Sequence, residues 1–229
     1  DCLLSRGLGD VYKRQHDKNG NFISPAEAIP ILEESGLIIP VGKWIIQNAF
    51  SMCTECRKYY PEFRVSINLS YVQILKSPLM MELKQMIDHS GISCSGIIVE
   101  LTESGYLEGT PAVRSVWNDM KQLRIQIALD DFGTGYSNLM NISNLEPDIV
   151  KLDRGFTLKA LSRSYEYQLM QYVIEMVHKL NQYVCVEGVE TKEDLEKIKA
   201  LGPDLIQGYY YSKPCSRDEF LKKFFCYSE

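Results

Sequence analysis

The chain has 229 residues, of which 45% are apolar and 24% are charged, and its formal net charge is −5. These proportions are those of an ordinary globular protein and exclude a disordered tail, a collagen-like fibre and a coiled coil. An acidic chain also excludes a protein that binds duplex DNA by neutralising phosphates, but not one that holds a small anion through metal ions.

Helix and strand patterns alternate along the chain. The run Ser24-Pro25-Ala26-Glu27 has the cap, the proline and the glutamate that open a helix, which we expect to end at Gly36. Further helices are predicted from about Pro40 and over 79–90, 111–123, 165–181, 192–201 and 216–225. Strands are predicted over 63–68, 97–100, 125–130, 148–153, 183–187 and 205–207.

Alternating strands and helices without a domain-sized linker predict a parallel α/β fold. The length and the spacing of the strands favour a (β/α)8 barrel of the TIM type over a small open sheet. Residues 1–15 lack the hydrophobic alternation of a first barrel strand, so we expect that strand to be irregular. We interpret 1–15 as an atypical N-terminal segment, foreign in character, over the place of strand one, and 16–229 as one barrel domain.

The apolar runs and the cysteines indicate the compartment. No apolar run approaches the roughly 18 residues of a membrane helix and no signal peptide opens the chain, so we expect a cytoplasmic protein. The seven cysteines are scattered along the chain, which favours reduced thiols over a disulfide scaffold. Cys53 and Cys56 form a C-x-x-C inside a helical pattern, and we favour a packing role for them over a redox or zinc role.

Nearly every predicted strand ends in a polar or charged side chain. These residues are Asn68, Glu100, Asp130, Asp131, Lys151, Asp153, Glu187 and Gln207. The carboxyl ends of barrel strands meet at one mouth, where carboxylates repel one another unless they share protons or bind cations. An all-oxygen donor set suits Mg²⁺ or Mn²⁺, and two such ions are the usual clamp for attack on a phosphodiester.

Each of these residues also has an ordinary structural interpretation. A single acid at a strand end is most often a helix cap or an ion-pair partner, and Asn68 could cap the next turn. Glu103 and Glu190 could order their loops through backbone N–H groups. Lys151 could form a Schiff base, but acidic surroundings would keep it protonated, which favours a cation that orients water or stabilises phosphate charge. The joint occurrence at successive strand ends favours a site.

Seven ordered motifs resemble those of a known family. They are Ile23-Ser24-Pro25, Asn68-Leu69-Ser70, Glu100-Leu101-Thr102-Glu103, Asp130 through Ser137, Lys151-Leu152-Asp153-Arg154, Glu187-Gly188-Val189-Glu190 and Gln207-Gly208-Tyr209. From about residue 16 to 220 the chain resembles the EAL-domain phosphodiesterases, which cleave cyclic di-GMP to linear pGpG with Mg²⁺ or Mn²⁺ in a (β/α)8 barrel. The resemblance implies a hydrolase with two divalent ions as cofactors, cyclic di-GMP as its substrate and a homodimeric assembly.

The resemblance also implies a role for each matching residue. The metal ligands that it implies are Asn68, Glu100, Asp130 and Asp131, with Glu187 at or near the second metal. It also implies four catalytic residues: Lys151, Glu187, Glu190 and Gln207. Lys151 would position the attacking water, whereas Glu190 and Gln207 would orient water or the metal ligands. Glu103 resembles the anchor of the loop that starts at Phe132, and Asp153 resembles a substrate-binding residue.

The motif that names the family, Glu-Ala-Leu-x-Arg on strand one, is absent. Counting back without a gap places Asp10-Val11-Tyr12-Lys13-Arg14 at its position. Arg14 would keep the cation that contacts phosphate, whereas Asp10 would replace the first metal-binding glutamate with a shorter carboxylate. This departure leaves open a second class of function, a catalytically degenerate barrel that acts as a cyclic di-GMP sensor or a protein-interaction module. An unrelated metal-dependent lyase or aldolase barrel is a third.

Overall fold

The computed structural model describes residues 8–10, 15–16, 22–102, 110–134, 142 and 145–225. Within them, seven strands form one sheet in the order β1-β4-β5-β6-β7-β8-β9, and every neighbouring pair is parallel. These strands are β1 (Leu8–Asp10), β4 (Arg64–Asn68), β5 (Ile97–Thr102), β6 (Gln126–Phe132), β7 (Ile149–Leu152), β8 (Tyr183–Val186) and β9 (Leu205–Ile206). A separate antiparallel pair comprises β2 (Gln15–His16) and β3 (Phe22–Ile23).

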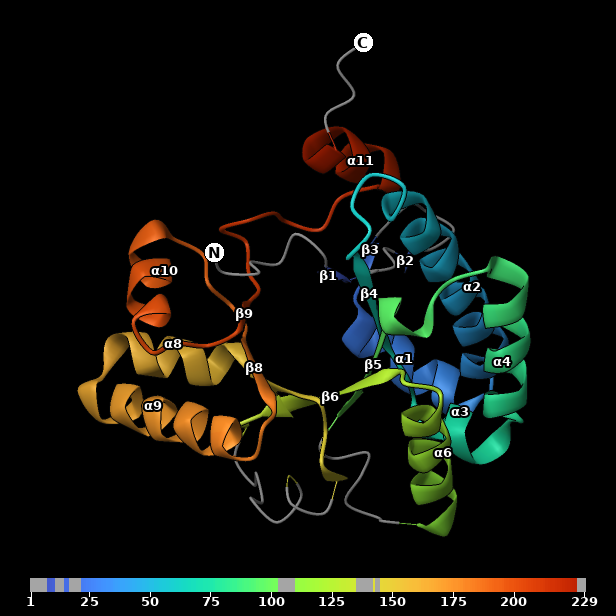
Figure 1. Cartoon of the computed structure of the whole chain (residues 1–229), viewed down its shortest axis with the longest axis horizontal. Coiled ribbons are helices and arrows are strands. Elements are labelled where there is room, and N and C mark those ends of the chain that lie inside the picture. The colour runs from blue at the N-terminus through green and yellow to red at the C-terminus, as the bar shows by residue number, and fades with distance from the viewer. Residues whose placement is uncertain are drawn as a thin grey trace.

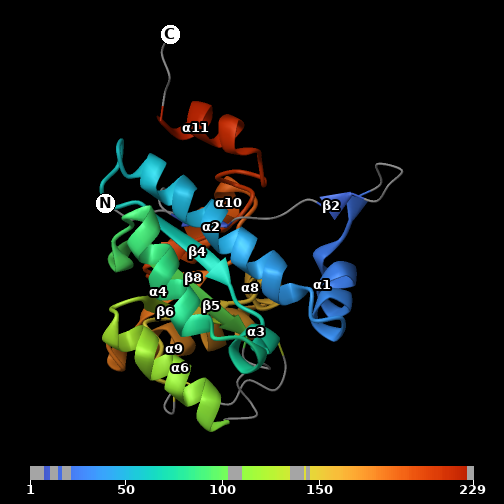
Figure 2. The same cartoon turned by 90° about the vertical axis from the view of Figure 1, so that its right-hand side faces the viewer.

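The helices lie on the outer side of the curled sheet (Figures 1 and 2). They are α1 (Pro25–Glu34), α2 (Ile38–Cys56), α3 (Tyr71–Lys76), α4 (Leu79–Ser90), α6 (Pro111–Gln122), α8 (Arg154–Ser162), α9 (Ser164–Lys179), α10 (Lys192–Lys199) and α11 (Arg217–Phe225), with a 3-10 turn at Cys94–Gly96. Strands that alternate with outer helices around a curled parallel sheet confirm the predicted barrel class. None of the helices described combines the length and the hydropathy needed to cross a membrane.

The predicted elements form within two residues of their expected bounds. The Ser24 hydroxyl accepts a hydrogen bond from the Glu27 backbone N–H at 3.3 Å, so the predicted helix cap is present. Helices α3 and α8 are not among the predicted elements. Helix α3 has only six residues, and α8 is capped by the strand-end residue Asp153 and followed almost at once by α9. Strand β1 forms within the segment that lacks strand alternation, and its three residues pair with residues 64–66 of β4.

Strand side chains alternate between two apolar clusters. The outer cluster packs the sheet against the helices and includes Ile67, Val99, Leu129, Val150 and Val186. The inner cluster consists of Ile98, Ala128, Ile149 and Cys185, with Leu205 packed against it. Because side chains repeat their direction every second residue, each strand presents another inward residue two positions later, toward its carboxyl end.

Two strands are preceded by the same dipeptide, Pro147-Asp148 and Pro203-Asp204. Asp148 Oδ2 accepts a hydrogen bond from the Ile127 backbone N–H at 2.8 Å, and Asp204 Oδ2 accepts one from Val184 at 2.8 Å. The backbone N–H of each aspartate donates in turn to the carbonyl of the same partner residue. A slip of one residue would turn every inward side chain outward. These paired hydrogen bonds therefore secure the register of β6 with β7 and of β8 with β9.

Cys53 and Cys56 are buried free thiols in α2. Burial raises the pKa of Cys53 to about 11 and the pKa of Cys56 to about 12. Both thiols therefore remain protonated at neutral pH, whereas the thiolate is the form that reacts and binds metals. The C-x-x-C packs α2 in the core, as predicted.

We predict that Asp148→Ala lowers the free energy of unfolding by about 1–3 kcal/mol, because it removes the acceptor of the buried Ile127 N–H. Chemical denaturation followed by circular dichroism measures the change. Asp88→Ala, on the exposed face of α4, is the matched control and should shift stability by less than about 0.5 kcal/mol. Equal effects of the two substitutions would contradict the register role of Asp148.

Candidate active site

Three carboxylates surround the ammonium group of Lys151 at the carboxyl ends of the strands. Its Nζ lies 2.9 Å from Glu100 Oε2, 3.1 Å from Asp130 Oδ1 and 2.7 Å from Glu187 Oε1. The Lys151 side chain is only 6% exposed, so water screens these contacts poorly. Burial by itself lowers the pKa of Lys151, but the three carboxylates raise it well above its ordinary value. Lys151 therefore stays a cation, which excludes the amine nucleophile that a Schiff base requires.

The alternation of the strands explains why these four side chains meet. Each stands two residues beyond a member of the inner apolar cluster. The pairs are Ile98 with Glu100, Ala128 with Asp130, Ile149 with Lys151, and Cys185 with Glu187. Four neighbouring strands thus change from apolar to charged at the same end of the barrel, which is the end where barrel enzymes carry their active sites.

Ser66 is a site residue that sequence reasoning missed. Its buried hydroxyl donates a short hydrogen bond to Glu100 Oε1, while Glu100 Oε2 faces Lys151. Both oxygens of the buried Glu100 carboxylate are therefore engaged. The signal in the sequence is a small polar residue at an inward position of β4, two residues before Asn68.

Glu187 differs from Glu100 in its exposure and its acidity. Its side chain is 21% exposed at the edge of the cluster. Burial raises the pKa of Glu187 to about 7, although the nearby Lys151 ammonium opposes the shift. A carboxyl group with this pKa can accept or release a proton near neutral pH.

Asp130 and Asp131 both belong to the mouth because the backbone departs from a regular strand between them. The register of β6 with β7 shifts between Leu129 and Phe132, and Asp131 has a left-handed φ of 60°. The Asp131 backbone N–H donates to Asp130 Oδ1 at 3.0 Å. Partial burial, followed by the charges of Asp130 and Asp153, raises the pKa of Asp131. The irregular backbone therefore keeps two consecutive carboxylates in one electrostatic environment.

Three further candidates stand at strand ends of the same mouth. Asn68 is exposed at the end of β4 and pairs in register with Glu100. Gln207 follows β9, and its backbone N–H donates to the Val186 carbonyl at 2.9 Å. Asp10 is the last residue of β1 and pairs in register with Ser66 of β4.

Other candidates have structural partners or lie outside the described residues. Asp153 Oδ1 accepts a hydrogen bond from the Gly155 backbone N–H at 2.7 Å and caps α8. Glu190 forms an ion pair with Arg154 at 2.8 Å. Arg14, Glu103 and the glycine-rich loop beyond Thr134 lie outside the described residues.

The residues of the mouth fit a hard cation in type and in charge. In the described part of the chain, no three Asp, Glu, His or Cys side chains are spaced as ligands of one metal ion, and the three carboxylates nearest one another face Lys151 instead. One ammonium nevertheless leaves an excess of negative charge among Glu100, Asp130, Asp131 and Glu187. Burial first, and then the charges of Asp130 and Asp153, raise the pKa of Asp131. An excess of oxygen donors without histidine or cysteine suits Mg²⁺ or Mn²⁺.

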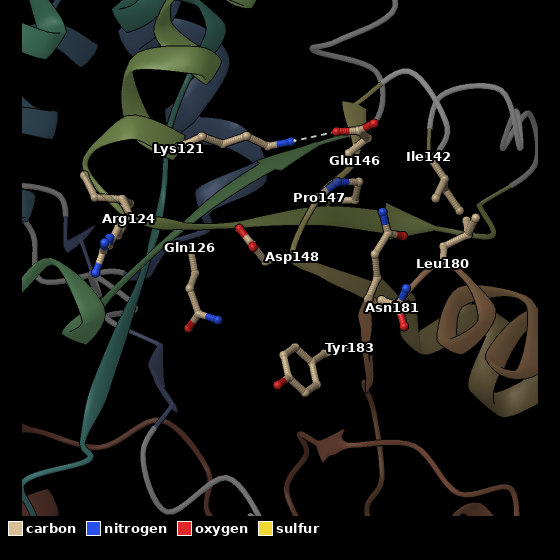
Figure 3. Close-up of a pocket in the computed structure, with 12 residues that line it drawn as sticks. Lys121, Arg124, Gln126, Ile142, Glu146, Pro147, Asp148, Leu180, Asn181 and Tyr183 are labelled. Atoms are coloured by element: carbon tan, nitrogen blue, oxygen red, sulfur yellow. Dashed lines mark hydrogen bonds and ion pairs between the residues drawn. The ribbon is translucent and has the colours of Figure 1, made fainter.

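A separate cavity of about 660 Å³ lies at the opposite end of the strands. Figure 3 shows Gln126, Asp148 and Tyr183 around it, with the ion pair of Lys121 and Glu146 at 3.4 Å on its rim. None of its lining residues belongs to the cluster around Lys151. The charged mouth and this cavity are therefore distinct features at the two ends of the barrel.

Comparisons with known proteins show which family and which fold this chain resembles. The model of the EAL domain family matches residues 10–214. The cyclic di-GMP phosphodiesterases PdeF and PdeR of Escherichia coli strain K12 are 31% and 32% identical over 90% and 91% of this chain. The chain spans only 28% and 32% of their lengths.

Two solved structures share the fold. The EAL enzyme Bd1971, with cAMP and cyclic di-GMP bound, has a TM-score of 0.86 and 29% identity over 92% of this chain and 58% of its own. The PaMucR phosphodiesterase in complex with cyclic di-GMP has a TM-score of 0.83 and 26% identity over 91% of this chain and 85% of its own. These neighbours confirm the fold that the strand order indicates.

We predict that Lys151→Met lowers the free energy of unfolding of the metal-free protein by about 3–5 kcal/mol, because it leaves buried carboxylates without their cation. Urea denaturation in the presence of a chelator measures the loss. Lys159→Met, on the exposed face of α8, makes the same change of side chain outside the cluster and should have little effect. A loss below about 1 kcal/mol for Lys151→Met would show that Lys151 does not hold the cluster together.

Proposed function

This chain belongs to the EAL domain family, and on that basis we propose that it hydrolyses cyclic di-GMP to linear pGpG with two divalent ions and water as the nucleophile. The observation that carries the proposal is the convergence of Glu100, Asp130 and Glu187 on Lys151 at the barrel mouth. The relatives named as cyclic di-GMP phosphodiesterases support the choice of substrate.

The excess of negative charge at the mouth supports a requirement for Mg²⁺ or Mn²⁺. The oxygen donors that would hold the ions are those of Asn68, Glu100, Asp130, Asp131, Glu187 and Asp10. Bound there, two divalent ions would lower the pKa of water and stabilise charge on the phosphodiester. Each phosphate of the substrate carries a negative charge, so the acidic mouth would repel it without cations.

Lys151 and Glu187 have different tasks in this proposal. Lys151 stays protonated, so it does not act as a base, and in this proposal it positions the attacking water through the carboxylates that it contacts. Glu187, 2.7 Å from Lys151 at the exposed edge of the cluster, would act at or near the second ion, where its carboxylate would help to polarise that water. Gln207, beside the end of β8, orients the water or the metal ligands, while Glu190 is engaged by Arg154.

We predict that the chain converts cyclic di-GMP to pGpG with Mg²⁺ or Mn²⁺ and that chelation of the metal abolishes turnover. Glu100→Gln keeps the size of the side chain and removes one ligand charge, so kcat/KM should fall by about 100-fold or more. Chromatography of the products measures both effects. Glu196→Gln, on the exposed face of α10, is the matched control. Turnover that persists without metal, or in Glu100→Gln, would contradict the proposed site.

The position of Asp10 supports a second candidate function, a degenerate barrel that binds cyclic di-GMP as a sensor or acts as a protein-interaction module. Asp10 stands at the end of β1 with a shorter reach than the family's glutamate. The homodimer and the role of Arg14, which the resemblance implies, stay predictions. The cytoplasmic location, which the apolar runs and the cysteines indicate, stays a prediction too.

We predict that Asp10→Glu raises kcat/KM by about tenfold at limiting metal concentration, because glutamate extends the carboxylate by one C–C bond and restores the residue type of the family motif. Turnover measured over a range of Mn²⁺ concentrations provides the test. Equal kcat/KM of the unsubstituted chain and of Asp10→Glu would show that aspartate at position 10 is sufficient for metal binding and turnover. Binding of cyclic di-GMP without turnover in either form would favour the sensor.

A further inference from the structure

A second ion pair lies three residues beyond the first on the same two chain segments. Lys151 pairs with Glu187, and Arg154 pairs with Glu190, so both pairs join residues 36 positions apart. Arg154 donates to Glu190 Oε1 from Nη2 at 2.8 Å and from Nε at 3.2 Å. The inner pair is buried in the cluster, whereas the outer pair lies at the exposed rim.

The aliphatic stem of Arg154 also covers the segment that carries Glu187. Gly188 has a φ of 80°, and a Cβ built there would overlap Cγ of Arg154. Only glycine therefore allows the backbone to lie this close beneath the arginine. The guanidinium and the stem of Arg154 thus hold two different points of the segment 187–190.

The opposite side of this segment rests against the turn that follows β9. The Val189 backbone N–H donates to the Gln207 carbonyl at 3.3 Å, and the Tyr210 N–H donates to the Val189 carbonyl at 3.0 Å. A Cβ built at Gly208 would overlap the Val189 backbone. The segment is therefore enclosed between Arg154 and the turn at 207–210, with Glu187 at its start.

We propose that Arg154 is a positioning residue, which holds Glu190 and covers Gly188 so that Glu187 stays in contact with Lys151. The inference rests on the proposed function in assigning Glu187 to the chemistry. An exposed ion pair contributes only about 0–1 kcal/mol to stability. A displacement of a catalytic group by about 1 Å, in contrast, costs about 100-fold in rate. The pair should therefore matter more to kcat than to folding.

Three substitutions separate the parts of this contact. Arg154→Met keeps an aliphatic stem over Gly188 and removes the positive charge. Arg154→Lys keeps the positive charge but loses the two hydrogen bonds of the guanidinium. Glu190→Gln removes the negative charge of the acceptor. We expect kcat to fall by about 10–100-fold in Arg154→Met and Glu190→Gln, and by less in Arg154→Lys. The KM for cyclic di-GMP should change by less than about twofold, because Arg154 acts through Glu187 and not on the substrate.

The double variant and the control test whether the two residues act as a unit. Arg154→Met combined with Glu190→Gln should be no slower than either single variant. Arg163→Met removes another exposed arginine that pairs with a glutamate, Glu166, away from the mouth, and should leave kcat unchanged. A rise in KM at constant kcat would show instead that Arg154 contacts substrate and would overturn the proposal. Additive losses, or losses of kcat that follow losses of stability, would overturn it too.

Hydrogen exchange gives a readout that does not depend on turnover. In the protein without ligand, the amides of 187–190 should exchange about tenfold faster in Arg154→Met than in Arg163→Met, with the rest of the barrel unchanged. Unchanged exchange in this segment would overturn the positioning role. A chain that turns over no substrate but shows the faster exchange would refute the proposed function and leave the structural clamp intact.

Discussion

The mouth of this barrel depends on one interaction, the contact of the Lys151 ammonium with Glu100, Asp130 and Glu187. Parallel strands bring these carboxylates together, and without a cation their repulsion at this depth would oppose folding. One ammonium compensates only part of their charge. The same arrangement that makes the fold possible therefore leaves an excess of negative charge, and that excess favours divalent ions. Stability and chemistry at this site have one electrostatic origin.

The two ends of the strands have different roles in this fold. At the amino ends, Asp148 and Asp204 accept backbone hydrogen bonds from the neighbouring strands and secure the register. At the carboxyl ends, charge accumulates, the backbone of Asp131 is left-handed, and loops contact one another through side chains. Because the register is fixed at the amino ends, the charged side chains at the carboxyl ends all point inward. The fixed register thereby supports a strained and charged arrangement at the mouth.

Much of the fold and of the site follows from local pattern. The strand ends could be predicted because β-branched runs and period-two alternation are local properties, and the barrel mouth then brings Glu100, Asp130 and Lys151 together. The contact of Ser66 was missed because a small hydroxyl residue inside a strand is not distinctive by type, and that of Arg154 because it joins two loops, whose course local pattern does not determine. Strand β1 could not be predicted either, because its pairing with β4 holds it in place although its residues lack hydrophobic alternation. Asp153 matched a substrate-binding position by resemblance and caps α8 in the structure.

The anomalous signal of Mn²⁺ in crystals of the unsubstituted protein, grown with cyclic di-GMP in a hydrolysis-resistant phosphorothioate form, tests the central claim most directly. The protein then keeps every proposed metal ligand, while the substrate is not turned over. We expect two Mn²⁺ peaks at the carboxyl ends of the strands, bound by oxygens of Asn68, Glu100, Asp130 and Asp131, with Lys151 beside the phosphate. The absence of Mn²⁺ from this mouth while cyclic di-GMP is bound would contradict the claim that its excess of negative charge serves divalent ions.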